Sequence, residues 1–100
     1  MKTQSSKQHG LEERTFKFAK NCRILVKQLP KTIGNIEDSK QLVQSSGSTH
    51  ANFIEAKESR SWLLLIEITE NRLLEQEQNS LAQEALELTR IFGSILEKEK

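Results

Sequence analysis

The sequence contains few prolines, glycines and aromatic residues. Its 100 residues include one proline, four glycines, four phenylalanines, one tryptophan and no tyrosine. Proline and glycine interrupt helices and aromatic residues favour strands, so their scarcity beside abundant Leu, Glu, Lys and Gln favours helices over sheets. A chain of this length supports one hydrophobic core rather than two. The composition therefore predicts an all-α protein with a single core.

Cysteine, histidine and long hydrophobic runs are scarce as well. Cys22 is the only cysteine, so no intrachain disulfide can form, and His9 and His50 add too few ligands for a typical metal site. The longest apolar run, residues 62–66, is far shorter than the roughly 20 residues that span a bilayer. We therefore expect a cytoplasmic protein without a metal, a cofactor, a small-molecule substrate or a membrane anchor.

The net charge of +1 hides a gradient along the chain. Residues 1–31 carry eight Lys or Arg against two Glu, whereas residues 61–100 carry four Lys or Arg against eight Glu. Such asymmetry indicates either an anionic partner for the first helix or complementary packing between the ends of neighbouring subunits.

Hydrophobic periodicity predicts three helices, at about residues 11–28, 35–69 and 80–97, after a disordered lead-in over residues 1–10. Residues 11–100 then form one helical-bundle domain. Each of the outer two helices has one apolar face, because its apolar residues recur with the 3.6-residue period of a helix. These stripes are Leu11, Phe18, Cys22, Leu25 and Leu29 in the first helix, and Leu81, Ala85, Leu88, Phe92 and Ile95 in the last.

A few residues predict where the helices begin and end. Pro30 ends the first helix, because the residue before a proline is pushed out of the helical region. Asn35 is a candidate N-cap for the second helix, and Ser80 with Gln83 is a candidate capping box for the last. The acidic, amide-rich residues 70–79 indicate a frayed helix end followed by a connection.

The middle helix shows a conflict between periodicity and propensity. Its stripe continues through residues 45–49, a Ser- and Gly-rich run that is typical of a loop. A continuous helix over residues 35–69, about 50 Å long, is the favoured prediction, because small residues on a buried stripe let helices approach closely. A break near Gly47 is the alternative. The stripe comprises Ile36, Val43, Gly47, Ala51 and Ile54.

The chain also contains six short motifs in a fixed order: LEERTF at 11–16, LPKTI at 29–33, QLV at 41–43, SSGS at 45–48, ANFIEA at 51–56 and KESRSWL at 57–63. Together they make residues 11–96 resemble the bacterial 23S rRNA intervening-sequence protein family. The resemblance implies an antiparallel four-helix bundle that tends to assemble into a homo-oligomeric ring, commonly a pentamer, with no known catalysis. The accessory variability determinant of diversity-generating retroelements looks like the same fold, and it binds reverse transcriptase and nucleic acid through a basic surface.

The chain departs from that family between Ala56 and Lys57. In the family about 20 residues, or five to six helical turns, separate the two segments that are fused here. The usual hairpin between the second and third helices therefore cannot form, and three outcomes are open. One is a single long helix whose far half packs on another subunit, and another is a break at residues 45–49 that leaves a short third helix at residues 51–69 and permits a compact monomer. The last is a degraded gene copy.

The candidate functional surface is the outer side of the first helix. Its cations fall within about a third of the helix circumference, where they would neutralise phosphates while Phe16 stacks on a base. The alternative is a solvated face with an oligomer seam anchored by Phe16 and Ile24. The candidate nucleic-acid-binding residues are Lys17, Lys20, Arg23, Lys27 and Lys31, and the candidate oligomer-interface residues are Phe16, Ile24, Phe53 and Trp62.

No set of residues predicts catalysis. Glu55 and Glu58 lie one turn apart, but helical carboxylates at this spacing are usually solvated or paired with Lys57 or Arg60. His50 is expected to be an interior or interface residue. Together with the family resemblance, which implies the partner and the assembly, this predicts a non-enzymatic accessory protein that binds RNA or a reverse-transcriptase-type partner as a homo-oligomer. The alternatives are a pure oligomeric scaffold and a degraded copy that does not bind nucleic acid.

Overall fold

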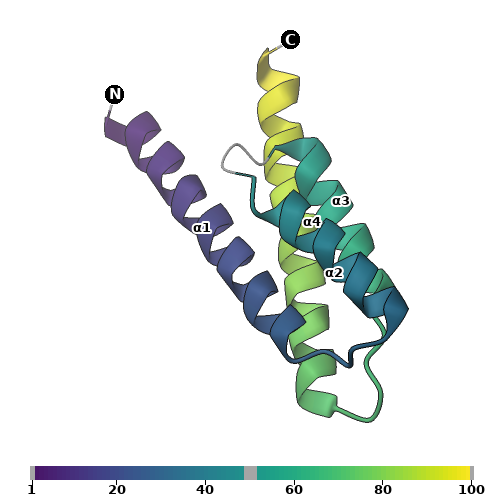
Figure 1. Cartoon of the computed structure of the whole chain (residues 1–100). Coiled ribbons are helices and arrows are strands. Elements are labelled where there is room, and N and C mark those ends of the chain that lie inside the picture. The colour runs from purple at the N-terminus through teal and green to yellow at the C-terminus, as the bar shows by residue number, and fades with distance from the viewer. Residues whose placement is uncertain (1, 49–51, 100) are drawn as a thin grey trace.

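The computed structural model describes residues 2–48 and 52–99, with side chains from Gly10 to Ser48 and from Asn52 to Lys98. Four helices account for most of these residues: α1 (Lys2–Lys27), α2 (Ile33–Ser46), α3 (Phe53–Leu65) and α4 (Arg72–Glu99). Neither described range contains a strand. In Figure 1, α2, α3 and α4 lie close together, and α1 diverges from them toward its N-terminus. The prediction of an all-α, four-helix bundle is confirmed.

The core lies where the apolar stripes of all four helices meet. Fully burying a leucine contributes about 2 kcal/mol relative to leaving it exposed, so the buried leucines are the main source of stability. The predicted stripes of the outer helices agree with the structure, except that Ile95 is 40% exposed. The least exposed apolar residues are Cys22 and Leu25 on α1, Leu42 on α2, Leu63 on α3, and Ala85 and Leu88 on α4.

The first helix begins at Lys2, earlier than predicted. Its first turns are formed by the segment that was expected to be a disordered lead-in. No proline interrupts residues 2–27. Extending an existing helix fixes the backbone of only one residue for each new hydrogen bond, so the helix can continue to Lys2. The helix ends at Lys27, three residues before Pro30, in agreement with the predicted stop.

The predicted continuous helix over residues 35–69 is wrong, and the alternative break near Gly47 is what the structure shows. α2 ends at Ser46, and the Gly47 N–H donates to the Val43 carbonyl at 2.9 Å. Turning here places α2 and α3 against each other, so that Leu42 and Leu63 enter one core. A straight rod would have left half of its apolar surface without cover from its own chain.

A capping box starts α3 after this break. The Asn52 side-chain oxygen accepts a hydrogen bond from the Ile54 N–H at 3.0 Å, and the Glu55 carboxylate accepts one from the Asn52 N–H at 3.3 Å. The box satisfies N–H groups that the first turn of a helix leaves without partners. Ala56 and Lys57 lie inside α3, so the change of direction between α2 and α3 comes before the junction of these two residues.

The lengths of the helices also differ from the prediction. α3 has 13 residues and ends at Leu65 rather than near residue 69, whereas α1 has 26 and α4 has 28. α4 begins at Arg72, so most of the predicted connection at residues 70–79 is helical. The Asn71 side-chain oxygen accepts a hydrogen bond from the Leu74 N–H at 3.0 Å, which is an N-cap interaction, and Ser80 lies inside the helix.

The predicted roles of the residues in α2 need two corrections. Thr32, rather than Asn35, is the N-cap, and its hydroxyl accepts from the Asn35 N–H at 3.1 Å. The predicted stripe is wrong at two residues, because Ile36 is 42% exposed and Ile54, which belongs to α3, is 61% exposed. Val43 and Gly47 are half-buried as expected, and Ala51 lies outside the described residues. The side chains of α2 that are buried are Asn35, Leu42, Ser45 and Ser46.

The small residues of α2 allow α3 to approach closely. The Ser45 and Ser59 hydroxyls lie 3.0 Å apart in a buried hydrogen bond between the two helices, and Ser59 also donates to the Glu55 carbonyl at 2.8 Å.

Among the described residues, no helix is both long and apolar enough to cross a membrane.

Candidate nucleic-acid interface

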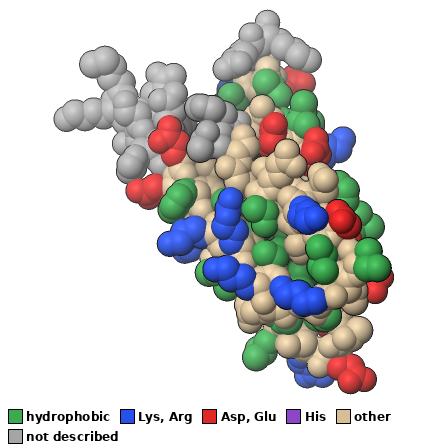
Figure 2. Space-filling model, viewed as in Figure 1, with side chains coloured by type: hydrophobic (Ala, Val, Ile, Leu, Met, Phe, Trp, Pro, Cys, Tyr) green, Lys and Arg blue, Asp and Glu red, His purple; other side chains and the backbone are tan. Residues whose placement is uncertain are grey.

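The outer side of α1 carries most of the candidate cations. They recur at intervals of three or four residues, which keeps them opposite the buried stripe of Phe18, Cys22 and Leu25. In Figure 2, basic side chains gather over α1 and the neighbouring part of α2, with hydrophobic side chains between them. The exposed cations are Lys17, Lys20, Arg23 and Lys27 on α1, and Lys31 in the connection to α2.

Within the described part of the chain, these cations have no acidic partner in an ion pair. Among the side chains that the structure describes, no carboxylate lies within ion-pair distance of any of the five. Cations without a nearby counter-charge raise the local concentration of anions. They also break no ion pair within the protein when they bind a phosphate. The surface is therefore chemically suited to a polyanion.

Two exposed apolar residues are interleaved with the cations. Phe16 is 67% exposed and Ile24 is 52% exposed. The Lys20 Nζ lies 5.8 Å from the centroid of the Phe16 ring, a cation–π contact that helps to hold the ring against the helix. An aromatic ring held beside cations is the arrangement on which an unstacked base can lie.

Phe53 and Trp62, predicted as interface residues with Phe16 and Ile24, have a different environment. Both are only partly exposed. The Phe53 ring packs on Gly93 of α4, where an added Cβ would come within 3.3 Å of the ring, and Trp62 packs against the core. The four residues thus fall into two pairs. Phe16 and Ile24 are exposed on α1, whereas Phe53 and Trp62 pack partly against their own chain.

Arg23 is oriented by the end of α2. Its guanidinium lies against Gly47, with Nη2 2.8 Å from the place where a Cβ would be. Gly47 follows the last turn of α2, where the unsatisfied carbonyls create a partial negative charge that attracts cations. The contact was not predicted from the sequence. The one sequence feature that could have indicated it is Gly47, whose missing side chain leaves room for the guanidinium.

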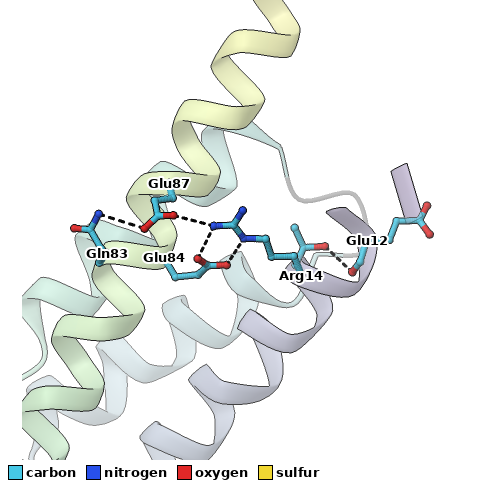
Figure 3. A network of polar contacts seen from close by, with 6 residues as sticks. Glu12, Arg14, Gln83, Glu84 and Glu87 are labelled. Atoms are coloured by element: carbon cyan, nitrogen blue, oxygen red, sulfur yellow. Dashed lines mark hydrogen bonds and ion pairs between the residues drawn. The ribbon is translucent and has the colours of Figure 1, made fainter. Parts of the chain in front are cut away.

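The opposite edge of α1 is attached to the acidic side of α4. The Arg14 Nε donates to Glu84 Oε2 at 2.7 Å, and its Nη2 donates to Glu84 Oε1 at 2.8 Å and to Glu87 Oε1 at 3.1 Å. Figure 3 shows the guanidinium between the two carboxylates, with Gln83 donating to Glu87 on the far side. The hydrogen bond to Glu84 is the largest of the effects that raise the pKa of Arg14 above its ordinary value.

This attachment distinguishes Lys17 from the other cations. Lys17 lines a groove of about 460 Å³ between α1 and α4 together with Glu77, Glu84 and Glu87. The carboxylates repel phosphate at short range, so Lys17 is the least favourable of the five for binding a polyanion. Lys20, Arg23, Lys27 and Lys31 remain as the stronger set.

Two side chains that could carry chemistry, Cys22 and Glu55, have structural roles in the described part of the chain. Cys22 is fully buried, and burial raises the pKa of its thiol to about 12, so it stays protonated at neutral pH. The Glu55 carboxylate caps α3, which removes it from the carboxylate pair with Glu58 considered above. Within residues 2–48 and 52–99 no group of three or more His, Cys, Asp or Glu is arranged to hold a metal ion; His50 lies outside those ranges.

No family model, curated protein or solved structure matches the chain. The likeness to the intervening-sequence proteins therefore stays an expectation based on the six motifs. What the molecule does must be inferred from its own surface, and the outer side of α1 is the part of that surface with a distinct chemistry.

Proposed function

We propose that this chain is a non-enzymatic, cytoplasmic accessory protein that binds RNA through the outer side of α1 and acts as a homo-oligomer. The observation that carries the proposal is the set of exposed cations, Lys20, Arg23, Lys27 and Lys31, without a carboxylate in ion-pair distance among the described side chains. The motif resemblance supports the same role. It also suggests a pentamer and, as another partner, a protein of the reverse-transcriptase type.

The length of the basic row sets the expected number of phosphate contacts. Lys20 and Lys27 are seven residues apart, which is about 10 Å along a helix, and Lys31 extends the row beyond the end of α1. One strand of a nucleic-acid duplex advances about 3 Å per phosphate along the helix axis, so the row covers about three or four phosphates. Binding of this kind is moderate in strength and depends strongly on salt.

A salt titration tests the proposal. We expect the logarithm of the affinity for a structured RNA to fall linearly with the logarithm of salt concentration. Replacing Lys20, Arg23 and Lys27 by Gln should reduce the slope by about three, because each lost phosphate contact removes roughly one unit.

The matched control changes the same amount of charge elsewhere. Lys57→Gln, Arg60→Gln and Lys98→Gln replace three exposed cations on α3 and α4. This triple variant should keep the wild-type slope. Equal slopes for the two triple variants, or no RNA binding at low salt, would contradict the proposal.

A second candidate is a scaffold without nucleic-acid binding, favoured by the exposure of Phe16 and Ile24. These residues share one side of α1 with Lys20 and Lys27, so a sister subunit seated there would cover the cations as well. Acidic residues of the sister's α4 would then neutralise them. The scaffold predicts assembly that is lost in a Phe16→Ser, Ile24→Ser variant and indifference of the wild type to RNA, which light scattering with and without RNA would detect.

A further inference from the structure

A cavity of about 210 Å³ opens where α1 ends and α2 begins. Its apolar walls come from Val26, Leu29, Pro30 and Ile36, and Lys27 and Lys31 also line it. Both lysines are exposed and belong to the basic row. The cavity is therefore continuous with the surface to which we assign RNA.

The size of the cavity limits what can enter it. Sites for drug-sized ligands usually measure about 300 to 1,000 Å³, so this cavity fits a single flat ring rather than a larger molecule. The walls favour an apolar face, and the two ammonium groups favour anions beside it. A nucleotide combines these properties, because its base has apolar faces and its flanking phosphates are negative.

The cavity is held open by the fold before any ligand arrives. Asn35, which also lines it, donates from Nδ2 to the Pro30 carbonyl at 3.1 Å and to the Glu67 carbonyl at 2.8 Å. Leu29 is only 4% exposed and anchors the connection in the core. A preformed site avoids the cost of ordering a loop on binding.

We propose that this cavity receives an unpaired base of the RNA bound by α1, with Lys27 and Lys31 holding the phosphates on either side of it. The inference rests on the proposed function and adds the class of RNA. A base in a regular duplex is stacked and paired and cannot reach the cavity, whereas a bulged base enters after little or no unpairing. The protein therefore prefers RNA with an unpaired nucleotide to a perfect duplex.

The test compares two RNA duplexes of the same sequence, one perfect and one with a single bulged nucleotide. Fluorescence anisotropy at fixed salt should show about tenfold tighter binding of the bulged duplex, within the range expected for accommodating one base. Ser39→Phe places a ring in the cavity that Ser39 lines. We expect it to abolish the preference while leaving binding of the perfect duplex unchanged, and Gln44→Phe, at an exposed position of α2, should retain the preference.

A second pair of variants guards against misfolding of Ser39→Phe. Ile36 is 42% exposed, so Ile36→Glu disturbs no core packing but places a carboxylate at the cavity. It should reduce the tenfold preference to less than twofold, whereas Gln44→Glu, with the same change of charge, should not. Equal binding of both duplexes by the wild type would overturn the cavity inference and leave the RNA proposal standing. Failure to bind either duplex would overturn both.

Discussion

The three side-chain hydrogen bonds of Asn35 all go to the backbone of the two connections at one end of the bundle. Besides the two carbonyls that its Nδ2 contacts, its Oδ1 accepts from the Glu67 N–H at 2.9 Å. Asn35→Ala would leave these backbone groups without partners in a site where the side chain is 2% exposed. We expect the free energy of unfolding to fall by about 2 kcal/mol. Urea denaturation would measure it, with Gln44→Ala as a control expected to change it little.

Cys22 is a residue whose burial has a consequence for pH. Because burial raises the pKa of its thiol from 9.0 to about 12, the unfolded chain releases this proton first as the pH rises. The contribution of Cys22 to stability is thus complete below pH 9 and is lost between pH 9 and about 12. The loss of unfolding free energy amounts to about 2 kcal/mol by pH 10.5.

The measurement is the difference in unfolding free energy between the wild type and Cys22→Ala across that range. The variant removes the thiol but keeps the other groups that titrate at high pH. We expect the advantage of the wild type to shrink as the pH rises from 8.5 to 10.5. A difference that does not change with pH would show that the thiol is accessible to solvent in the folded protein.

On the scale of one element, α2 offers a matched pair of glycines. A Cβ at Gly34 would meet nothing within 4 Å, whereas one at Gly47 would lie 2.7 Å from the Val43 carbonyl oxygen and 2.8 Å from Arg23 Nη2. Gly34→Ala should raise the free energy of unfolding by about 0.5 kcal/mol, because alanine loses less entropy on folding. Gly47→Ala should lower it by about 1 to 2 kcal/mol, because backbone atoms must move. Thermal unfolding followed by circular dichroism would compare the two, and a shift of the same sign in both would contradict the assigned break.

The attachment of α1 depends in part on one ion-pair network. The Arg14 side chain is 37% exposed, so its pairs with Glu84 and Glu87 contribute at most about 1 kcal/mol despite their good geometry. Arg14→Gln should therefore lower global stability only slightly. It should increase hydrogen exchange of α1 amides more than that of α3 amides, and high salt should have the same effect on the wild type. Uniform changes across both helices would contradict a local role.

On the scale of the whole molecule, one chain closes its own core. Leu25, Leu42, Leu63 and Leu88 come from four different helices and are each at most 1% exposed, so no swapped helix is needed to cover them. We therefore expect the helical signal and the melting temperature to change little when the protein is diluted from about 100 to 1 micromolar. Loss of helix on dilution would show that folding needs the oligomer.

Assembly, if it uses the exposed pair on α1, is then separable from folding. Replacing Phe16 and Ile24 by Ser removes apolar groups that are 67% and 52% exposed. The molar mass from light scattering should fall while the melting temperature stays within a few degrees, because these side chains contribute little to the core. A large fall in melting temperature would instead place them in the packing of the folded chain.

The sequence by itself determined the helical class, the buried faces of the first and last helices and the stop before Pro30. These features depend on local propensity and on a repeat of 3.6 residues, both of which are present in any short window of the chain. The exposed cations of α1 could be predicted for the same reason, because they lie opposite the clearest apolar stripe.

Only the tertiary structure decided where the middle segment breaks and which of its residues are buried. Periodicity favoured Ile36 and Ile54 as core residues and joined two helices into one, since a stripe of small residues continues through Gly47. The chain turns there because two short helices cover each other's leucines, which are far apart in a straight rod. The cavity beside Lys27 and Lys31 and the contact of Arg23 with Gly47 both depend on how α1 packs against α2, because each joins residues from the two helices.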